Sequence, residues 1–264
     1  MIRSMYSGVS GLKNHQIKMD VIANNIANVN TCAFKASRVT FQDVYSQTIR
    51  SSSAANGNIG GINPMQIGLG MTVASIDTLF GTAAPQITGQ QLDLYLEGDG
   101  FFVVYDGENE YYTRAGNFAI DNEGNIVLRS NGLYLLDENG GIIDTTGFTE
   151  VSVNSNGEVT GIDETDGSER VIAVLGIAVF SNPSGLLKVG GNMYAQTQNS
   201  GDANIENCGE GGAGYIRAGS LELSNVDLAN EFTEMITTQR GFQANSRIIT
   251  TSDSMLEELV NLKR

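Results

Sequence analysis

The two ends of the chain read IRSMYSGVSGLKNHQIKMDVIANNI over residues 2–26 and LANEFTEMITTQRGFQANSRIITTSDSMLEELV over residues 228–260. In both stretches apolar residues recur at alternating intervals of three and four, which is typical of a helix that packs lengthwise on another helix. The repeat positions are Ile2, Met5, Val9, Leu12, Gln16, Met19, Ala23 and Ile26, and then Leu228, Phe232, Met235, Gln239, Phe242, Ser246, Ile249, Asp253, Leu256 and Val260. We expect the two terminal helices to pair with each other.

A helix that docks on its own domain would show a similar pattern, and this alternative stays open for either end alone. Two helices of about 1.5 Å per residue would run roughly 40 and 50 Å, longer than the intervening domain can cover. The first thirty residues carry few charges, namely Arg3, Lys13, Lys18 and Asp20, and many amides and hydroxyls. Uncharged hydrogen-bonding side chains suit a face packed against several neighbours. We therefore predict that the N-terminal helix is multiply packed in an oligomer.

Charge is unevenly distributed along the 264 residues, whose net charge is −15. Residues 51–215 hold 21 acidic and four basic side chains, whereas the two ends are near neutral. This acidic middle argues against a nucleic-acid partner, which needs a basic surface. The chain has no run of 18 apolar residues, so we expect no membrane insertion, and residues after Arg3 lack the apolar region of a signal peptide.

The sequence contains no recognisable catalytic, metal-binding or cofactor-binding arrangement. His15 is the single histidine, and Cys32 and Cys208 have no CxxC or histidine companion, so both cysteines are predicted to be free. Residues 121–125 and 137–140 resemble fragments of calcium loops but lack the full set of ligand positions, and we interpret them as hairpin turns. We predict a protein that is not an enzyme and needs no cofactor.

Between the ends, short β-branched or aromatic runs alternate with Asn-Gly and Asp-Gly turns, which predicts antiparallel strands. The predicted strands are residues 72–79, 92–96, 101–105, 111–113, 117–120, 126–128, 133–136, 150–153, 158–162 and 170–180. Before them, residues 51–70 (SSSAANGNIGGINPMQIGLG) have the composition of a linker. The predicted fold is therefore α+β. Residues 1–30 and 226–264 form terminal helices paired as a coiled coil, 31–70 an extended linker, and 71–225 an antiparallel β outer domain.

Three blocks of sequence resemble the bacterial flagellar rod and hook axial proteins. At the C-terminal end these are SNVDL (224–228), QRGFQANS (239–246) and TTSD (250–253), and near the start ANNIANVNT (23–31) followed by Phe34-Lys35. In the middle, residues 92–94, 98–102 and 112–118 resemble the body of the same family. The motif residues carried by this resemblance are Asn24, Asn25, Asn28, Asn225, Asp227, Gln239, Arg240 and Asn245.

The resemblance implies a subunit of a hollow helical tube, in which paired terminal helices form the inner layer and a β domain the outer layer. It implies self-assembly, contacts with other flagellar rod, hook and junction proteins, and passage through the type III export apparatus without a cleaved signal peptide. The location would be extracellular, in the hook or basal body of the flagellum. Residues expected to carry helix pairing and polymerisation are Met5, Val9, Leu12, Met19, Ile26, Phe232, Met235, Phe242, Ile249 and Leu256.

The C-terminal helix also carries charges that suit its ends. Asp227 can cap its start, Glu231 and Glu234 lie in its first turns, and Lys263 and Arg264 end it with the sign that the helix dipole favours. Polar repeat positions such as Gln16, Gln239, Ser246 and Asp253 cost stability, but they can fix the register of a subunit in a lattice.

Within the family, the sequence favours the hook over the distal rod. Residues 37–41, 231–235 and 259–264 resemble compact hook proteins of Gram-positive bacteria, whereas the short length and residues 51–63 resemble distal rod proteins.

Cys32-Ala33 stands where the family has a small residue and Gly, so the turn there can differ. A remoter alternative is a secreted carbohydrate-binding adhesin whose helices merely trimerise it, but that would predict an aromatic-lined cleft, and the chain has no Trp.

Overall fold

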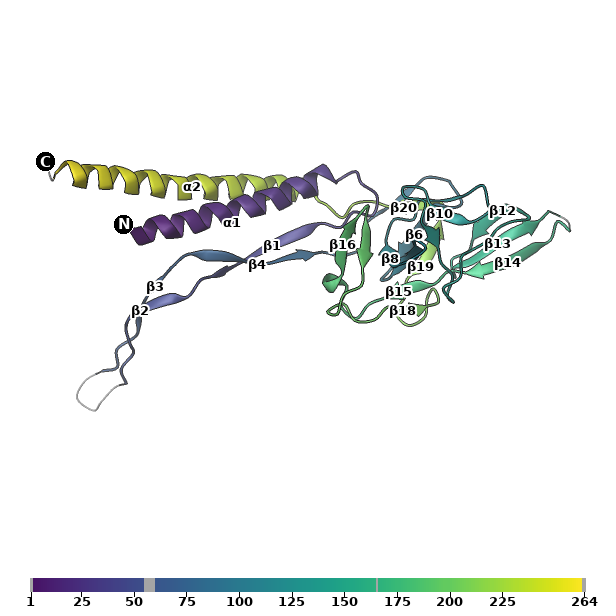
Figure 1. Ribbon diagram of the computed structural model, residues 1–264, viewed down its shortest axis with the longest axis horizontal. Coiled ribbons are helices and arrows are strands. Elements are labelled where there is room, and N and C mark those ends of the chain that lie inside the picture. Colours follow the sequence, from purple (N-terminus) through teal and green to yellow (C-terminus); the bar gives the residue numbers. More distant parts are fainter. Residues whose placement is uncertain (1, 55–59, 165, 263–264) are drawn as a thin grey trace. The chain divides into compact units, whose positions relative to one another are not determined.

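The computed structural model of the chain describes residues 2–54, 60–164 and 166–262 (Figure 1). Over these residues it contains two long helices, α1 (Ile2–Ala27) and α2 (Leu228–Asn261), separated by antiparallel strands. The predicted α+β class is confirmed. The chain forms two compact units. The first unit contains residues 1–27, 37–78 and 227–264, and the second contains residues 28–36 and 79–226.

In the first unit α1 and α2 lie side by side (Figure 1), accompanied by a long two-stranded ribbon. Strand β1 (Ser37–Asp43) pairs antiparallel with β4 (Met71–Thr78), and β2 (Ser46–Arg50) pairs with β3 (Met65–Gly68). The ribbon thus joins residues of the expected linker, 31–70, to residues 71–78 of the expected β domain. A two-stranded ribbon buries few side chains, and this explains why a Ser- and Gly-rich composition did not indicate strands. The division of the chain into an inner layer, a linker and an outer domain stays a prediction.

The second unit is built on a large antiparallel sheet. Its main path, in order, is β16 (Leu187–Gly190), β17 (Met193–Ala195), β8 (Glu110–Thr113), β7 (Phe101–Tyr105), β11 (Tyr134–Leu135), β10 (Ile126–Leu128) and β9 (Phe118–Ile120). Strand β15 (Ile177–Val179) pairs with both β7 and β18 (Asn204–Glu206). Smaller sheets are made by β12 (Phe148–Val153), β13 (Glu158–Asp163) and β14 (Glu169–Val174), by β6 (Leu94–Glu97) with β19 (Tyr215–Ala218), and by β5 (Pro85–Ile87) with β20 (Ser220–Glu222). A 3₁₀ turn, η1 (Pro183–Gly185), precedes β16.

The predicted strands between residues 71 and 174 correspond to strands of the structure, with ends that differ by a few residues. One prediction was wrong: residues 170–180 form two strands, β14 and β15, instead of one. Between them the chain passes from the three-stranded sheet, which contains β14, to the large sheet, which contains β15. It does so at Gly176, where a Cβ would lie 2.9 Å from the carbonyl oxygen of Asp137, so this close approach of the two backbones needs glycine. Strands β16 to β20 carry short or mixed patterns and were not predicted.

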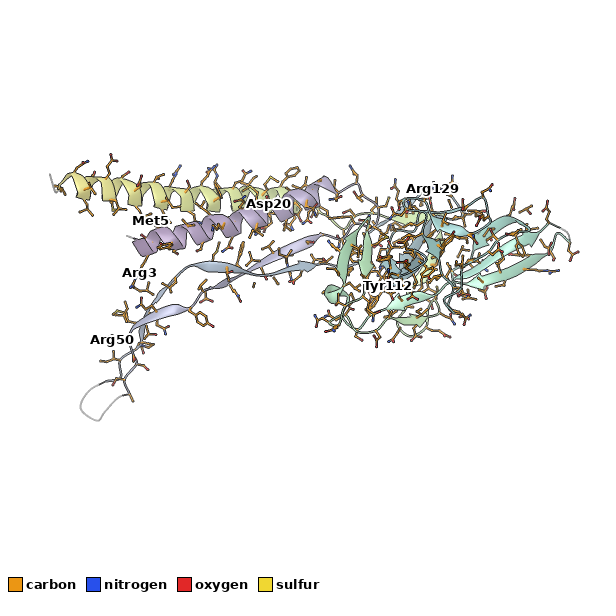
Figure 2. The ribbon with its side chains drawn as sticks, in the orientation of Figure 1. Arg3, Met5, Asp20, Arg50, Tyr112 and Arg129 are labelled. Carbon is orange, nitrogen blue, oxygen red and sulfur yellow. The ribbon has the colours of Figure 1, made fainter. Side chains whose placement is uncertain are left out.

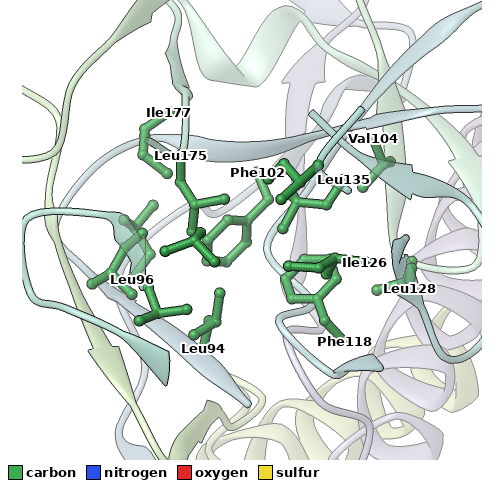
Figure 3. Packing of buried hydrophobic residues seen from close by; sticks show 14 of the residues in the cluster. Leu94, Leu96, Phe102, Val104, Phe118, Ile126, Leu128, Leu135, Leu175 and Ile177 are labelled. Carbon is green, nitrogen blue, oxygen red and sulfur yellow. The ribbon is translucent and has the colours of Figure 1, made fainter. Parts of the chain in front are cut away.

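Buried apolar clusters cover both faces of β7 in the second unit. Phe102 and Val104 join one buried cluster, while Phe101 and Val103 join another on the opposite face. Alternate side chains of a strand point to opposite faces, so the apolar run FFVV fits a strand that is covered on both sides. Figure 3 shows the first cluster, where the Phe102 and Phe118 rings meet edge to face at 5.4 Å.

The predicted hairpin turns are present at the expected glycines. Backbone φ is positive at Gly107, Gly124, Gly132, Gly140, Gly157 and Gly167. The turn after α1 contains Ala33, which has φ +57° and is buried. Its backbone adopts a left-handed conformation that glycine takes most easily, and the chain therefore keeps at Ala33 the turn that a glycine would make.

Candidate assembly surface of the terminal helices

The contact between α1 and α2 is made at glycines. A Cβ at Gly8 would lie 3.5 Å from Ile249, a Cβ at Gly11 would lie 2.7 Å from the Asn245 amide, and a Cβ at Gly241 would lie 2.8 Å from the His15 ring. Each glycine therefore lets a side chain of the facing helix approach the backbone closely. Gly8 and Gly11 lower the intrinsic stability of α1, because glycine is a poor helix former, but they lie where the two helices pack most closely.

Two polar contacts extend the same seam. Lys18 Nζ lies 2.5 Å from Glu234 Oε2, and Asn25 Nδ2 donates to Glu231 Oε1 at 3.0 Å. Asp227 caps α2 as predicted, since its carboxylate accepts from the backbone N–H groups of Ala229 and Asn230. Lys263 and Arg264, the predicted basic end of α2, lie outside the described residues.

The seam of the helix pair lies one residue before the predicted one, except at Ile249, which is itself a predicted position. Its α1 members are Gly8, Gly11, His15, Lys18, Ile22 and Asn25, and its α2 members are Glu231, Glu234, Thr238, Gly241, Asn245, Ile249 and Ser252. Apart from two successive intervals of four between Gly241 and Ile249, the spacing of three and four is as predicted, but the residues at the contact are mostly small or polar. The physical reason is distance: small residues allow the backbones to come together, and the bulkier apolar residues flank the contact.

Of the ten residues expected to pair the helices, Ile249 lies in the seam, and the other nine lie beside it or away from it. Met5, Leu12, Met19, Ile26, Met235, Phe242, Ile249 and Leu256 are half-buried. Val9 and Phe232 are exposed, Phe232 by 50 %, so neither pairs the helices within one chain. Side chains project from both helices along their length, as Figure 2 shows with Met5 and Asp20 labelled on α1. The role of these ten residues in polymerisation stays a prediction.

The uncharged polar face of α1 packs on the ribbon of its own unit. Asn14 Nδ2 donates to the Met71 carbonyl at 2.6 Å. Asn25 is buried and forms two bonds with the backbone of Ser37, donating to its carbonyl and accepting from its N–H. These amide side chains give hydrogen-bond partners to backbone N–H and C=O groups of the ribbon, which would otherwise lose their water and have no partner when buried. Part of the multiple packing predicted for this face is thus supplied by the chain itself.

The other motif residues cap or tie local backbone. Asn28 accepts from Thr31 Oγ1 at 3.2 Å, and Asn245 Nδ2 donates to the Gly241 carbonyl at 3.0 Å. Asn225 accepts from the Ala36 N–H and donates to the Leu79 carbonyl. Arg240 donates to Gln243, while Asn24 and Gln239 are exposed.

A buried ionic cluster in the second unit was missed by sequence reasoning. Lys35 Nζ lies 2.6 Å from Glu222 Oε1 and also donates to the Gly81 carbonyl, and both side chains are fully buried. Arg114 Nη1 lies 3.9 Å from Glu222 Oε2, and the Ala83 N–H donates to Glu222 Oε1. With the Asn225 bonds, the cluster holds together three segments, 33–36, 79–83 and 222–225, each of which connects to the first unit in sequence.

Burial dominates the electrostatics of this cluster. It lowers the pKa of the Lys35 ammonium and of the Arg114 guanidinium, and the nearby Glu222 carboxylate opposes both shifts. Burial likewise raises the pKa of Tyr194, with Glu222 adding to the shift. Phe34-Lys35 is part of the family motif, but nothing in the local sequence pattern indicates an ion pair.

Large apolar side chains remain exposed along both helices and the ribbon. On the helices they include Tyr6, Val9, Ile17, Phe232, Ile236, Ile248, Met255, Leu259 and Val260, and on the ribbon Tyr45, Ile49, Ile62, Met65, Ile67 and Leu69. Tyr45 is 92 % exposed. Neither helix, over its described residues, is long and apolar enough to cross a membrane. In the described part of the chain, no group of three or more His, Cys, Asp or Glu side chains is placed to hold a metal ion.

Comparison with known proteins gives three matches to sequence families, in chain order. Residues 5–35 match the flagella basal body rod protein family, residues 95–161 the flagellar hook protein FlgE/F/G D1 domain, and residues 217–262 the flagellar basal body rod FlgEFG protein C-terminal family.

Proteins that align with the whole chain belong to the same group of flagellar proteins. The flagellar basal-body rod protein FlgG of Bacillus subtilis is 53 % identical over 266 residues, and the alignment covers 100 % of both chains. FlgG of Caulobacter vibrioides is 33 % identical over 266 residues, covering 99 % of this chain and 100 % of that protein. The flagellar hook protein FlgE of Borreliella burgdorferi is 30 % identical over 442 residues, covering 100 % of both.

These relatives are structural flagellar proteins, which confirms both the predicted family and the prediction that the protein is not an enzyme. Between the two predicted assignments, they favour the distal rod over the hook that the sequence favoured. The chain belongs to the FlgE/F/G family of flagellar rod and hook proteins and is a structural component of the flagellum.

Proposed function

We propose that the chain is the subunit of the distal rod of the flagellar basal body, polymerised as a hollow helical tube. The observation that carries this proposal is the end-to-end match, at 53 % identity, to a basal-body rod protein of nearly the same length. The alignment with the Borreliella hook protein extends over 442 positions, so a chain of 264 residues has no counterpart for much of that protein.

The surface of the first unit supports assembly. Its helices pair through small and polar residues, and many bulky apolar side chains are left exposed on the helices and the ribbon. Large exposed apolar surfaces mark sites of association. We infer that neighbouring copies cover them and that α1 and α2 act as a true coiled coil in the tube wall. The inferred partners are further copies, other rod, hook and junction proteins, and the type III export apparatus, which would carry the chain out without cleaving a signal peptide.

Electron microscopy of the purified full-length protein, concentrated or seeded with rod fragments, tests the proposal. Straight hollow tubes are expected for a rod subunit. Curved tubes would instead identify a hook subunit, and a persistent small oligomer that binds glycans would favour the adhesin alternative and contradict both.

Phe232→Asp tests which surface drives assembly. Because Phe232 is exposed on α2, the charge should abolish tube formation while the helix pair and the β unit stay folded. Phe232→Tyr keeps most of the apolar area and should still polymerise. Ile249→Asp, beside Gly8, should abolish tubes by breaking the helix pair, with loss of helical circular dichroism. Normal tubes from Phe232→Asp would show that this face is not a subunit contact.

A further inference from the structure

The single histidine of the chain lies in the seam of the helix pair. On one side of His15 is Gly241 of α2, where a Cβ would lie 2.8 Å from the ring. On another side is Phe41 of β1, whose ring centroid lies 5.8 Å away in an edge-on contact. His15 Nδ1 is buried and has no hydrogen-bond partner among the described residues. The imidazole, carried by α1, therefore packs against both α2 and the ribbon, and the described residues offer no acceptor for an added proton at Nδ1.

The charges near His15 do not favour a second positive charge. On α1, Lys18 is the charge that acts on His15, and it also lies over the Phe41 ring. On α2, Glu234 is already paired with Lys18, and Glu231 binds Asn25 further along the seam. The hollow beside His15 is otherwise lined by uncharged residues from both helices and the ribbon, namely Ser7, Gly11, Gly68, Gly70, Met71 and Asn245. Over the described residues, Lys18 is the one charge that acts measurably on His15, and no carboxylate lines the hollow.

We propose that protonation of His15 weakens the packing of the first unit. When the ring takes up a proton, α1 packs less tightly on Gly241 of α2 and on Phe41 of β1. A buried imidazolium would keep an unpaired N–H at Nδ1 and would repel Lys18, and both effects favour separation of the packed elements. Because the packing concerns one chain, the inference does not depend on whether the tube is a rod or a hook.

The direction of the pH effect follows from the same contacts. Burial, and secondly Lys18, lower the pKa of His15 in the folded unit below its ordinary value of about 6.5. The stabilising contribution of the neutral ring is therefore complete above pH 6.5 and is lost as the pH falls through the lowered pKa. Glu231 acts in the opposite sense, because burial raises its pKa and its protonation on acidification favours the folded unit.

Two measurements on the full-length soluble chain test the proposal. The first is proton NMR of the His15 ring between pH 8 and 5, which needs no assignment because the chain has one histidine. We expect a pKa below 6.5 in the wild-type chain, and a value close to 6.5 in Gly241→Ala, where the new Cβ displaces the ring. A wild-type pKa at or above 6.5 would overturn the proposal.

The second measurement is helical circular dichroism at 222 nm over the same pH range. The wild-type chain should lose helical signal as His15 is protonated, and His15→Gln, which is uncharged at every pH, should lack that step. The difference between the two curves removes the contribution of Glu231, which both chains share. If the two curves coincide, His15 does not control the packing and the proposal is wrong.

Discussion

Two lysine–glutamate pairs of nearly equal length lie in very different surroundings. Lys35 and Glu222, 2.6 Å apart in the second unit, are both 0 % exposed. Lys18 and Glu234, 2.5 Å apart across the helix pair, are 25 % and 45 % exposed. Water screens the second pair, so its net contribution is small, whereas the first pair has given up its hydration and depends on its partners. Loss of one partner should therefore strongly destabilise the second unit at the buried pair, and should hardly affect the first unit at the exposed pair.

The two units differ in the same way throughout. The second unit encloses two apolar clusters, with rings packed edge to face around Phe101 and Phe102. The first unit is joined by glycines and amides and leaves much of its apolar surface exposed. Because hydrophobic burial supplies most folding free energy, we expect the second unit to be stable in a single chain, and the first to gain stability from neighbouring copies if the proposed assembly is correct. This contrast fits a subunit that folds one part alone and completes the other on assembly.

Glu222→Gln should have the largest effect, because it leaves the Lys35 ammonium buried without a countercharge. Breaking a buried ion pair by removing one partner costs about 3–5 kcal/mol of unfolding free energy, and the amide oxygen can retain part of that. We expect a loss of about 3 kcal/mol in the urea unfolding of the β unit, followed by circular dichroism at a strand wavelength.

The matched control is Glu234→Gln, the same substitution in the exposed pair. We expect a change of less than about 1 kcal/mol, decreasing further in high salt. Equal losses for the two variants would mean that burial does not separate the pairs, and the contrast between the units would fail.

Gly11→Val should have the next largest effect, confined to the first unit. A Cβ at residue 11 meets the Asn245 amide at 2.7 Å, so a branched side chain must displace Asn245 from the seam or push the helices apart. Overpacking of this kind costs about 1–3 kcal/mol. We expect a lower midpoint for the thermal loss of signal at 222 nm, with the strand signal unchanged.

Gly8→Ala is the control for that substitution, since its Cβ would lie 3.5 Å from Ile249, an ordinary contact. Alanine favours the helix over glycine by about 1 kcal/mol, so this variant should be neutral or more stable. A large loss in Gly8→Ala would indicate that the helices are closer than the structure shows.

The terminal helices were predicted from the repeat, because the spacing of three and four persists over both ends. The phase of the contact was not predicted, since the repeat was read from the large apolar residues. Gly8, Gly11 and Gly241 make the contact, and a pattern of hydrophobicity gives glycine no weight. We expect the half-exposed apolar residues that dominate the pattern to make the contacts of the proposed assembly.

In the β unit, strands such as β7 and β10 were predicted because local alternation and Asn-Gly turns fix them. The ion pair was not, because Lys35 and Glu222 are 187 residues apart and neither carries a local signal. In the ribbon, β4 was predicted but β1 to β3 and their pairing were not, for a related reason: the ribbon depends on amides of α1, such as Asn14 and Asn25, and on few buried side chains of its own. Long-range polar contacts of this kind lie beyond what periodicity in a sequence can indicate.

Glu231→Gln is expected to have the smallest effect, and it tests the seam of the first unit at its polar end. Burial raises the pKa of Glu231, against the opposing effect of the Asn25 hydrogen bond, so the ionised form weakens the helix pair as the pH rises through that pKa. Glutamine keeps an oxygen for Asn25 and removes the charge. The variant should therefore be more stable at pH 7, by less than about 1 kcal/mol, and equal to wild type near pH 4 in thermal unfolding at 222 nm. The helix dipole acts in the other direction, because Glu231 lies in the first turn of α2. A less stable variant at pH 7 would show that this attraction, and not burial, determines the ionisation of Glu231.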